Sequence, residues 1–456
     1  MPSAFYGISI AGRAMQSFQY AMLTTSHNIA NVNNSAYSRQ IVDFRDGIPQ
    51  FEMGIRPFYL GGGTEIGAVT RVRDRFLQQR YMDTSTEGGR FATLAANLKQ
   101  AEVAFGELST SSGISEYLDQ FFNAFQQLSA NPSDTALRST VRQAADQLAR
   151  RFRTLDADLA TQQRNVTAQV QDHIGRLNQL AGDLATLNKR IVEAQATGAT
   201  PNDLLDQREA ILAEMSNIAE VRSNVMPNGT MQVYLDQFTL VDQSGANELS
   251  TTVDVATSSI VVNGLNVRVA SGALGGSFET LNKLSGYRTQ LDTLAGSIIS
   301  EVNLLHSSGY ALDGTTGHML FSGTGASTFD LSDEVKASAQ NIVAAATNEA
   351  GDGSVALAIA QLRSATHAGL GGRSFSGFYG DLVTGVASDL KGAQAALDAQ
   401  SGIRQQIVAQ IEAQSGVNLD EELANMMKYQ RTYEAAARLL TIFDSVLEET
   451  IGLLGR

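Results

Sequence analysis

The sequence lacks cysteine and tryptophan, and aromatic residues make up only 7% of its 456 residues. Without cysteine the chain can form no disulfide, no thiolate metal site and no thiol nucleophile. This absence fixes no compartment, although it suits a protein that stays unfoldable until it reaches an oxidising exterior. Alanine, glycine, glutamine, serine and threonine are plentiful, and this composition is typical of long helices with modest side chains.

Long apolar runs and an excess of basic residues are also missing. No stretch of 18 apolar residues is present, so we expect no helix that spans a bilayer. No basic segment leads into an apolar block at the start of the chain, and we expect no cleaved secretory signal. The net charge of −14, from 33 basic and 47 acidic residues, argues against nucleic acid as a partner. The length suits about three domains.

Catalytic and metal-binding patterns are scarce. The histidines are His27, His173, His306, His318 and His367. None has a second histidine at metal-ligand spacing, so we interpret each as a lone surface or cap residue. The glycine-rich segment 61–67 lacks the lysine of a phosphate loop and precedes a predicted strand, where a dinucleotide fingerprint would follow one. We therefore predict no catalytic residue, no cofactor, no metal site and no enzyme activity, which leaves an interaction role.

The C-terminal stretch from Asn418 to Leu454 carries the strongest helical pattern. Its stripe alternates spacings of four and three for about five heptads without proline, which is typical of a coiled-coil seam. Asn418 is a good N-cap for this helix. At 1.5 Å per residue the helix is roughly 54 Å long, so it needs a partner of matching length. The predicted seam residues are Leu419, Leu423, Met426, Tyr433, Leu440, Leu447, Ile451 and Leu454.

The start of the chain repeats this spacing and offers such a partner. The predicted N-terminal seam residues are Ile8, Ala11, Met15, Phe18, Met22 and Ile29. One stripe alone is more often ordinary core. Matching stripes at both ends predict that the N- and C-terminal helices pair as a coiled coil and leave the middle of the chain as a looped-out body.

The middle of the chain changes from helical to extended character. Proline is absent from Thr135 to Ala196, which predicts one very long helix, and a shorter helix is expected over 204–218. Short strands are expected between 221 and 269, with a hairpin at Pro227-Asn228-Gly229. A glycine-rich connection over 271–277 then leads to helices over 278–306 and 378–414.

The predicted fold is mainly α with a β-rich insert. Residues 1–40 and 416–456 are assigned to a terminal helical coiled coil. Segments 41–219, 275–310 and 355–415 are assigned to a long-helix bundle body. Segments 220–274 and 311–354 are assigned to a small outer β domain. No repeat of fixed period is present.

A polar turn after the first helix resembles a family signature. The segment 30–40 is similar to the signature that closes the N-terminal helix of bacterial flagellar axial proteins, the rod, hook and hook-associated proteins. Segments 61–77, 204–208 and 375–379 fit the same family. The string 415–422, with the residues that follow it to Arg438, resembles the hook-associated proteins of the hook–filament junction. The turn-motif residues are Asn31, Asn33, Tyr37, Ser38, Arg39 and Gln40.

This resemblance covers roughly two-thirds of the chain, with the β insert matching only weakly. It implies export through the flagellum's own type III channel without a cleaved signal, and a place outside the cell at the hook–filament junction. The terminal stripes are then assembly seams that form the inner tube. The implied partners are further copies in a ring, the hook protein, the second junction protein and an export chaperone on the C-terminal seam.

Two alternative functions remain open at this point. The chain could be another axial component, either the second junction protein or the hook subunit. It could instead be a secreted adhesin or surface-interaction protein that acts through the β insert. An enzymatic insert is the weakest reading, because residues 220–354 contain only His306 and His318 and no activated nucleophile.

Overall fold

The computed structural model describes residues 2–34, 36–53, 57–106, 113–349 and 351–454. The fold is mostly helical, and its strands form small antiparallel sheets of two or three strands. This confirms a mainly α fold with minor β structure. Within the described ranges no helix combines the length and the apolar character that crossing a membrane requires.

The chain divides into two compact units. Unit 1 contains residues 1–85, 177–248 and 401–456, and unit 2 contains residues 86–176 and 249–400. Three long helices contribute residues to both units. They are α2 (Arg75–Phe105), α4 (Thr135–Ala196) and α9 (Phe375–Ser415). The bounds of α4 confirm the helix predicted from Thr135 to Ala196.

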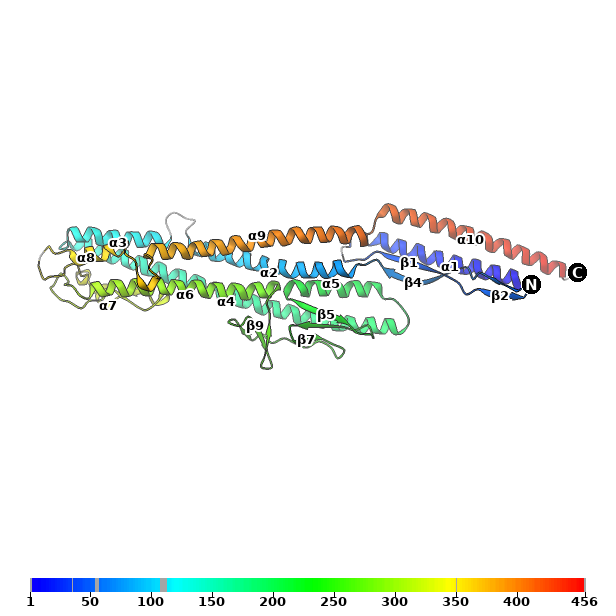
Figure 1. Cartoon of the computed structure of the whole chain (residues 1–456), viewed down its shortest axis with the longest axis horizontal. Coiled ribbons are helices and arrows are strands. Elements are labelled where there is room, and N and C mark those ends of the chain that lie inside the picture. The colour runs from blue at the N-terminus through cyan, green and yellow to red at the C-terminus, as the bar shows by residue number, and fades with distance from the viewer. Residues whose placement is uncertain (1, 35, 54–56, 107–112, 350, 455–456) are drawn as a thin grey trace. The chain divides into compact units, whose positions relative to one another are not determined.

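Unit 1 is built around the two ends of the chain. Its remaining elements are α1 (Pro2–Ala30), β1 (Gln40–Asp46), β2 (Gln50–Met53), β3 (Pro57–Leu60), β4 (Thr64–Arg71), α5 (Asn202–Ile218), β5 (Val221–Val225), β6 (Met231–Leu235), β7 (Phe238–Val241) and α10 (Leu419–Leu454). Helices α1 and α10 lie side by side, as Figure 1 shows. Asn418 caps α10 as predicted, because its Oδ1 accepts the Asp420 amide at 3.0 Å.

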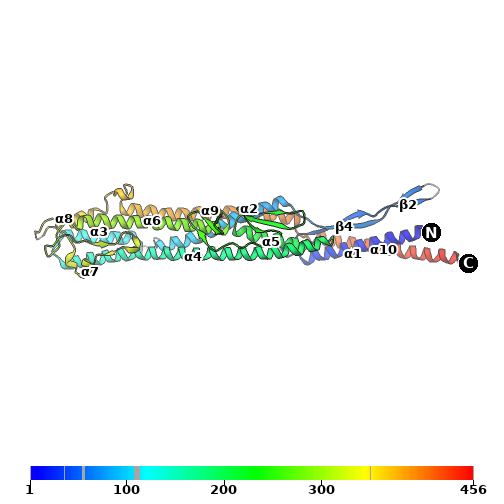
Figure 2. The same ribbon diagram turned by 90° about the horizontal axis from the view of Figure 1, so that it is seen from below.

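A long two-stranded ribbon runs beside α1. Strands β1 and β4 pair antiparallel, from Gln40 opposite Arg71 to Asp46 opposite Thr64, and β2–β3 forms a second hairpin beyond them (Figure 2). The ribbon changes from one pair to the next at two glycines. A Cβ on Gly62 would collide with the backbone of Gly47, so this close approach requires glycine.

Hydrogen bonds fasten the ribbon to α1. The Tyr6 hydroxyl donates to the Gly61 carbonyl oxygen at 3.2 Å, and the Ser17 hydroxyl donates to the Thr64 carbonyl oxygen at 3.3 Å. Arg13 pairs with Glu65 at 3.0 Å. These contacts are spread along the helix, so the ribbon follows α1 over much of its length.

Unit 1 also contains the predicted hairpin at Pro227-Asn228-Gly229. Strands β5 and β6 pair around it with Val225 opposite Met231, and Gly229 has a φ of 88°, which glycine adopts at little cost. The buried Asn188 side chain in α4 bonds both the amide and the carbonyl of Met231. The hairpin prediction is confirmed.

Among the described residues, the buried phenylalanine and tyrosine side chains all lie in unit 2. Its own elements are α3 (Ile114–Ala130), β8 (Val253–Asp254), β9 (Ser259–Val262), β10 (Leu265–Arg268), α6 (Gly272–His306), β11 (Phe321–Ser322), η1 (Ala326–Thr328), β12 (Asp330–Leu331), α7 (Asp333–Ala337), η2 (Ala339–Asn341), α8 (Ser354–Gln361) and η3 (Ala368–Leu370). Phe121, Phe122 and Phe125 of α3 are fully buried and pack edge to face, at ring centroid separations of 5.1 and 5.2 Å.

Two sequence expectations for unit 2 are wrong. Helix α6 begins at Gly272, so the predicted glycine-rich connection over 271–277 is the first part of that helix. Its glycines allow close packing, since a Cβ on Gly276 would collide with the Arg90 carbonyl. His306 and His367 are buried, although both were expected at the surface or at a cap.

His306 has a defined hydrogen-bonding state. Its Nε2 accepts the Val343 amide at 2.9 Å, so Nδ1 carries the proton and donates to the His318 carbonyl oxygen at 2.6 Å. Burial lowers the pKa of His306 to about 4. A proton added at Nε2 would displace the Val343 amide, which explains why the neutral ring is preferred here.

Candidate assembly site

The two terminal helices run antiparallel along their contact. Near one end the Ser26 hydroxyl lies 4.0 Å from the Met426 sulfur, and further along the rings of Phe18 and Tyr429 stack at 6.3 Å. Near the other end a Cβ on Gly7 would lie only 2.7 Å from the ring of Phe443. The helices therefore stay close over most of α1.

The predicted N-terminal seam lies largely on the protected side of α1. Ala11 is buried, and the other five predicted residues, Ile8, Met15, Phe18, Met22 and Ile29, are half-buried. Small residues that the stripe did not include are buried more deeply, among them Gly7, Ser17 and Ala21. The small size of these residues is the sequence signal that could have identified them as contact residues, because small residues let two helix backbones approach closely.

The predicted C-terminal seam divides between two faces of α10. Met426, Tyr433, Leu440 and Leu447 are half-buried, Leu419, Leu423 and Ile451 are exposed, and the Leu454 side chain lies outside the described set. The protected face also holds Glu422, Tyr429, Ala436 and Phe443. The protected stripe and the predicted stripe therefore share Met426, Tyr433, Leu440 and Leu447. At the alternate positions the protected residue lies one place before the predicted one, as Glu422 does before Leu423.

A polar cluster joins the end of α1 to the start of α10. It consists of Asn28, Tyr37, Ser38, Arg39, Gln40, Arg71, Arg73, Asp203, Asp206, Glu209 and Glu422, and we call it the polar hub. Its members come from segments 28–40, 71–73, 203–209 and 415–422 of unit 1. All but Asn28 lie in or next to the motifs that carried the family resemblance.

Asn28 is the centre of one half of the hub. Its side chain donates to the Gln40 carbonyl at 2.9 Å and to Glu422 at 3.1 Å, and it accepts from the Gln40 amide at 3.0 Å and the Tyr37 hydroxyl at 2.7 Å. All four hydrogen-bonding positions of the buried amide are therefore filled. Burial, together with the nearby Asp203, raises the pKa of Tyr37, so its hydroxyl stays a donor.

Glu422 is the C-terminal helix's contribution to the hub. It is only 2% exposed, and Arg39 Nε donates to its carboxylate at 2.8 Å. Arg39 also pairs with the exposed Glu421 at 3.0 Å. The Arg39 amide donates to the carbonyl of Ser415, the last residue of α9, at 3.2 Å, so backbone and side chain connect the turn motif to the junction between α9 and α10.

Asp206 of α5 is the centre of the other half. It accepts from the Ser38 hydroxyl at 2.7 Å, the Ser38 amide at 3.0 Å and Arg71 at 2.7 Å. Arg73 bonds both Asp206 and Glu209, which keeps two arginines and two carboxylates together. Buried charges in proteins are normally paired in this way.

The turn-motif residues have different roles in this arrangement. Tyr37, Ser38, Arg39 and Gln40 all bond within the hub, whereas the Asn31 side chain closes α1 by donating to the His27 carbonyl at 3.0 Å. Asn33 is exposed on the turn. Sequence reasoning missed Asn28, Asp206 and Glu422 as hub partners, since nothing local indicates which distant charges meet. Among the described residues, no three metal-ligating side chains cluster.

Comparison with known sequences and structures gives a consistent result. Residues 98–321 match the family described as flagellar hook-associated protein FlgK helical domain, and residues 409–453 match the family described as flagellar basal body rod FlgEFG protein C-terminal. Flagellar hook-associated protein 1 of Bacillus subtilis is 28% identical, with 100% of this chain and 99% of the relative covered. The Salmonella typhimurium protein of the same name is 24% identical, with 96% and 99% covered.

A solved structure shares the fold. The flagellar hook junction protein FlgK from Burkholderia pseudomallei superimposes with a TM-score of 0.64 at 16% sequence identity, covering 73% of this chain and 99% of that one. At this level of identity the likeness concerns the fold.

Proposed function

The chain belongs to the flagellar hook-associated protein FlgK family, and we propose that it is a structural subunit of the junction between the hook and the filament of the bacterial flagellum. It acts outside the cell, associates with hook and filament components, and has no catalytic role, in keeping with a structural family. The observation that carries the proposal is the full-length match to hook-associated protein 1. In this chain, the N- and C-terminal motifs of the resemblance meet in the polar hub.

Assembly uses the terminal helices, paired as a coiled coil that forms the inner tube. Segments 41–219, 275–310 and 355–415 form the body, and segments 220–274 and 311–354 form the outer β domain. Seven large apolar side chains of α10 are 45–56% exposed, and they are Leu419, Leu423, Met427, Leu439, Ile442, Val446 and Ile451. Covering the exposed half of each contributes about 1 kcal/mol, before the cost of association. Neighbouring copies in a ring supply that cover.

Deletion of the gene tests the junction role. We expect cells that keep their hooks, release filament subunits into the medium and do not swim, and we expect the intact chain to restore swimming. Immunogold labelling should then mark one short band between hook and filament. Swimming without the chain, or label along the whole filament, contradicts the proposal.

The export chaperone binds the C-terminal helix in this proposal. A chain that ends at Gln414 lacks α10 and should fail to capture the chaperone, whereas the full chain should capture it. Capture by the shortened chain would place the binding site elsewhere.

A further inference from the structure

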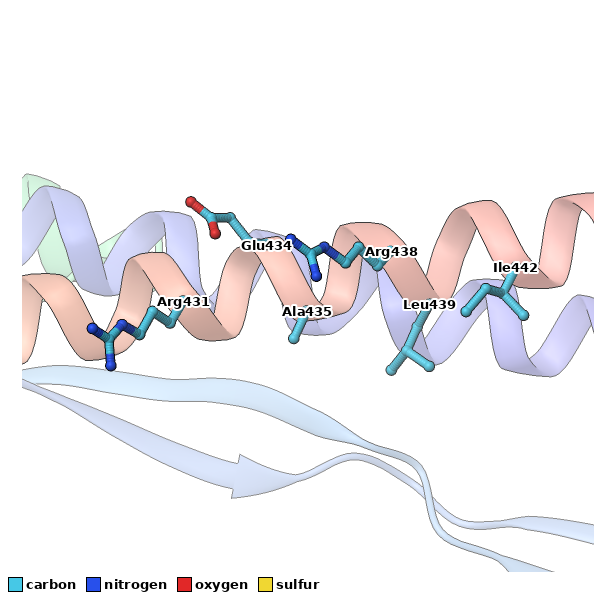
Figure 3. Close-up of a pocket in the computed structure, with 6 residues that line it drawn as sticks. All are labelled: Arg431, Glu434, Ala435, Arg438, Leu439 and Ile442. Carbon is cyan, nitrogen blue, oxygen red and sulfur yellow. The ribbon is translucent and has the colours of Figure 1, made fainter.

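Two surfaces of unit 1 expose apolar side chains. The first is a shallow hollow on the outer face of α10, lined by Arg431, Glu434, Ala435, Arg438, Leu439 and Ile442, which we call the α10 hollow (Figure 3). The second consists of four described side chains in or just before strands β2 and β3, Ile48, Phe51, Phe58 and Tyr59, which we call the ribbon tip.

The ribbon tip is unusually apolar for a surface hairpin. Ile48 is 82% exposed and Tyr59 is 71% exposed, while Phe51 and Tyr59 pack edge to face at 5.2 Å. Two-stranded hairpins are at best marginally stable in water. A hairpin that presents this much apolar surface therefore gains stability from a partner.

The α10 hollow offers the matching chemistry. Leu439 and Ile442, which help to line it, are each about half exposed. Within the described part of the chain, neither Arg431 nor Arg438 forms an ion pair. Arginine stacks on aromatic faces, and both residue types are enriched at the centres of protein interfaces. The exposed Asp46, at the base of the tip, adds a carboxylate for the same arginines.

The tip and the hollow of one copy lie at different levels along the α1–α10 pair. Leu60, the last residue of β3, accepts a hydrogen bond from Tyr6, so the ribbon tip lies near the first turns of α1, as Figure 2 also shows. The hollow ends at Ile442, just before Phe443 meets Gly7, and extends back from there toward Tyr429. The tip can therefore fill the hollow of a second copy that is shifted along the axis.

We propose that the ribbon tip of one copy docks into the α10 hollow of the next. The contact joins two different surfaces, so each copy can receive one neighbour and offer its tip to another. Head-to-tail contacts of this kind generate rings or helical arrays. This inference rests on the proposed function and identifies which surfaces of the terminal pair meet between copies.

Cysteine cross-linking tests the contact directly, because the natural chain has no cysteine. Ile48→Cys and Ala435→Cys are exposed single changes that leave Tyr59, Arg438 and Leu439 in place. Both chains are co-expressed in a strain lacking the gene, and a short bis-maleimide is added to isolated flagella. We expect a dimer band only when both variants are present. The matched control combines Ala435→Cys with Val225→Cys, an exposed position on β5, and should give no dimer.

Other results have distinct meanings. Cross-linking of either variant with itself indicates a two-fold contact and overturns the inference. Absence of the mixed dimer in flagella that swim overturns it as well and leaves the junction role intact. Failure of the unaltered chain to reach the flagellum overturns the proposed function and this inference together.

Side-chain variants supply a second measurement. In the cysteine pair, Tyr59→Ser and Arg438→Glu should each lower the dimer yield at least tenfold, whereas Tyr59→Phe, which keeps the aromatic ring, should keep most of it. Equal yields for the disruptive and the conservative variants would contradict docking through these groups.

Discussion

Removing the Glu422 carboxylate should open the polar hub locally. The group is 2% exposed and accepts from Arg39 at 2.8 Å and Asn28 at 3.1 Å. In Glu422→Ala, Arg39 keeps its bond to Glu421, but one buried N–H of Asn28 loses its acceptor. A buried donor without a partner costs about 1–3 kcal/mol, and a hydrogen bond to a charged group contributes about 1.5–3 kcal/mol. Because these two contributions overlap, we expect the free energy needed to open the polar hub to fall by about 2–3 kcal/mol.

Hydrogen exchange measures this loss where it occurs. The Gln40 amide donates to Asn28 Oδ1 at 3.0 Å, so it reports on the same side chain. A loss of about 2–3 kcal/mol corresponds to exchange about 30–150 times faster. Glu421→Ala is the matched control, since that carboxylate is exposed and its ion pair contributes at most about 1 kcal/mol. Equal exchange rates of the Gln40 amide in the two variants would refute the reasoning that the buried Glu422 carboxylate stabilises the polar hub.

Three further changes probe other parts of the structure. Asp206→Ala leaves two arginines with a single remaining carboxylate. The free energy of unfolding of unit 1, measured in urea with probes placed in that unit, should therefore fall by about 3–5 kcal/mol. Gly7→Leu places a side chain against Phe443 and should cost about 1–3 kcal/mol by the same measurement, with recovery in the double variant with Phe443→Ala. The pKa of His306 is lowered from 6.5 to about 4, so the unfolded chain binds the extra proton first. Stability should therefore fall by about 3 kcal/mol as the pH falls from 6.5 to 4, read from exchange of the Val343 amide.

The helices could be predicted where their signals are local. The bounds of α4 agree with the proline-free stretch from Thr135 to Ala196, and α10 starts directly after its predicted cap, Asn418. The start of α6 could not be predicted in this way. Gly275 and Gly276 indicate flexibility when only the sequence is considered. Both lie in the helix, at positions where other backbone atoms come too close for a side chain.

The protected face of α10 shows the limit of periodicity. The apolar residues Leu419 and Leu423 favoured one phase of the stripe, whereas the folded chain protects Glu422 and Tyr429 instead. A carboxylate on the contact side is acceptable only because Arg39, 383 residues earlier, donates to it. Helical spacing contains no information about a partner at that distance, so the two phases could not be separated from the sequence.

The two faces of α10 have different consequences for anything that binds it. A partner on the outer face, which includes Leu419, Leu423 and Ile451, can bind while α1 stays in place. A partner that takes Met426 and Tyr433 must displace α1, because those side chains lie on the protected side. Displacement of α1 separates Asn28 from Glu422 and therefore opens the hub. In a complex with the proposed export chaperone, the Gln40 amide should then exchange quickly if the chaperone uses the protected face, and slowly if it uses the outer face. A chaperone on the protected face would keep the two terminal helices apart, whereas one on the outer face would cover the surface that we propose contacts the next copy.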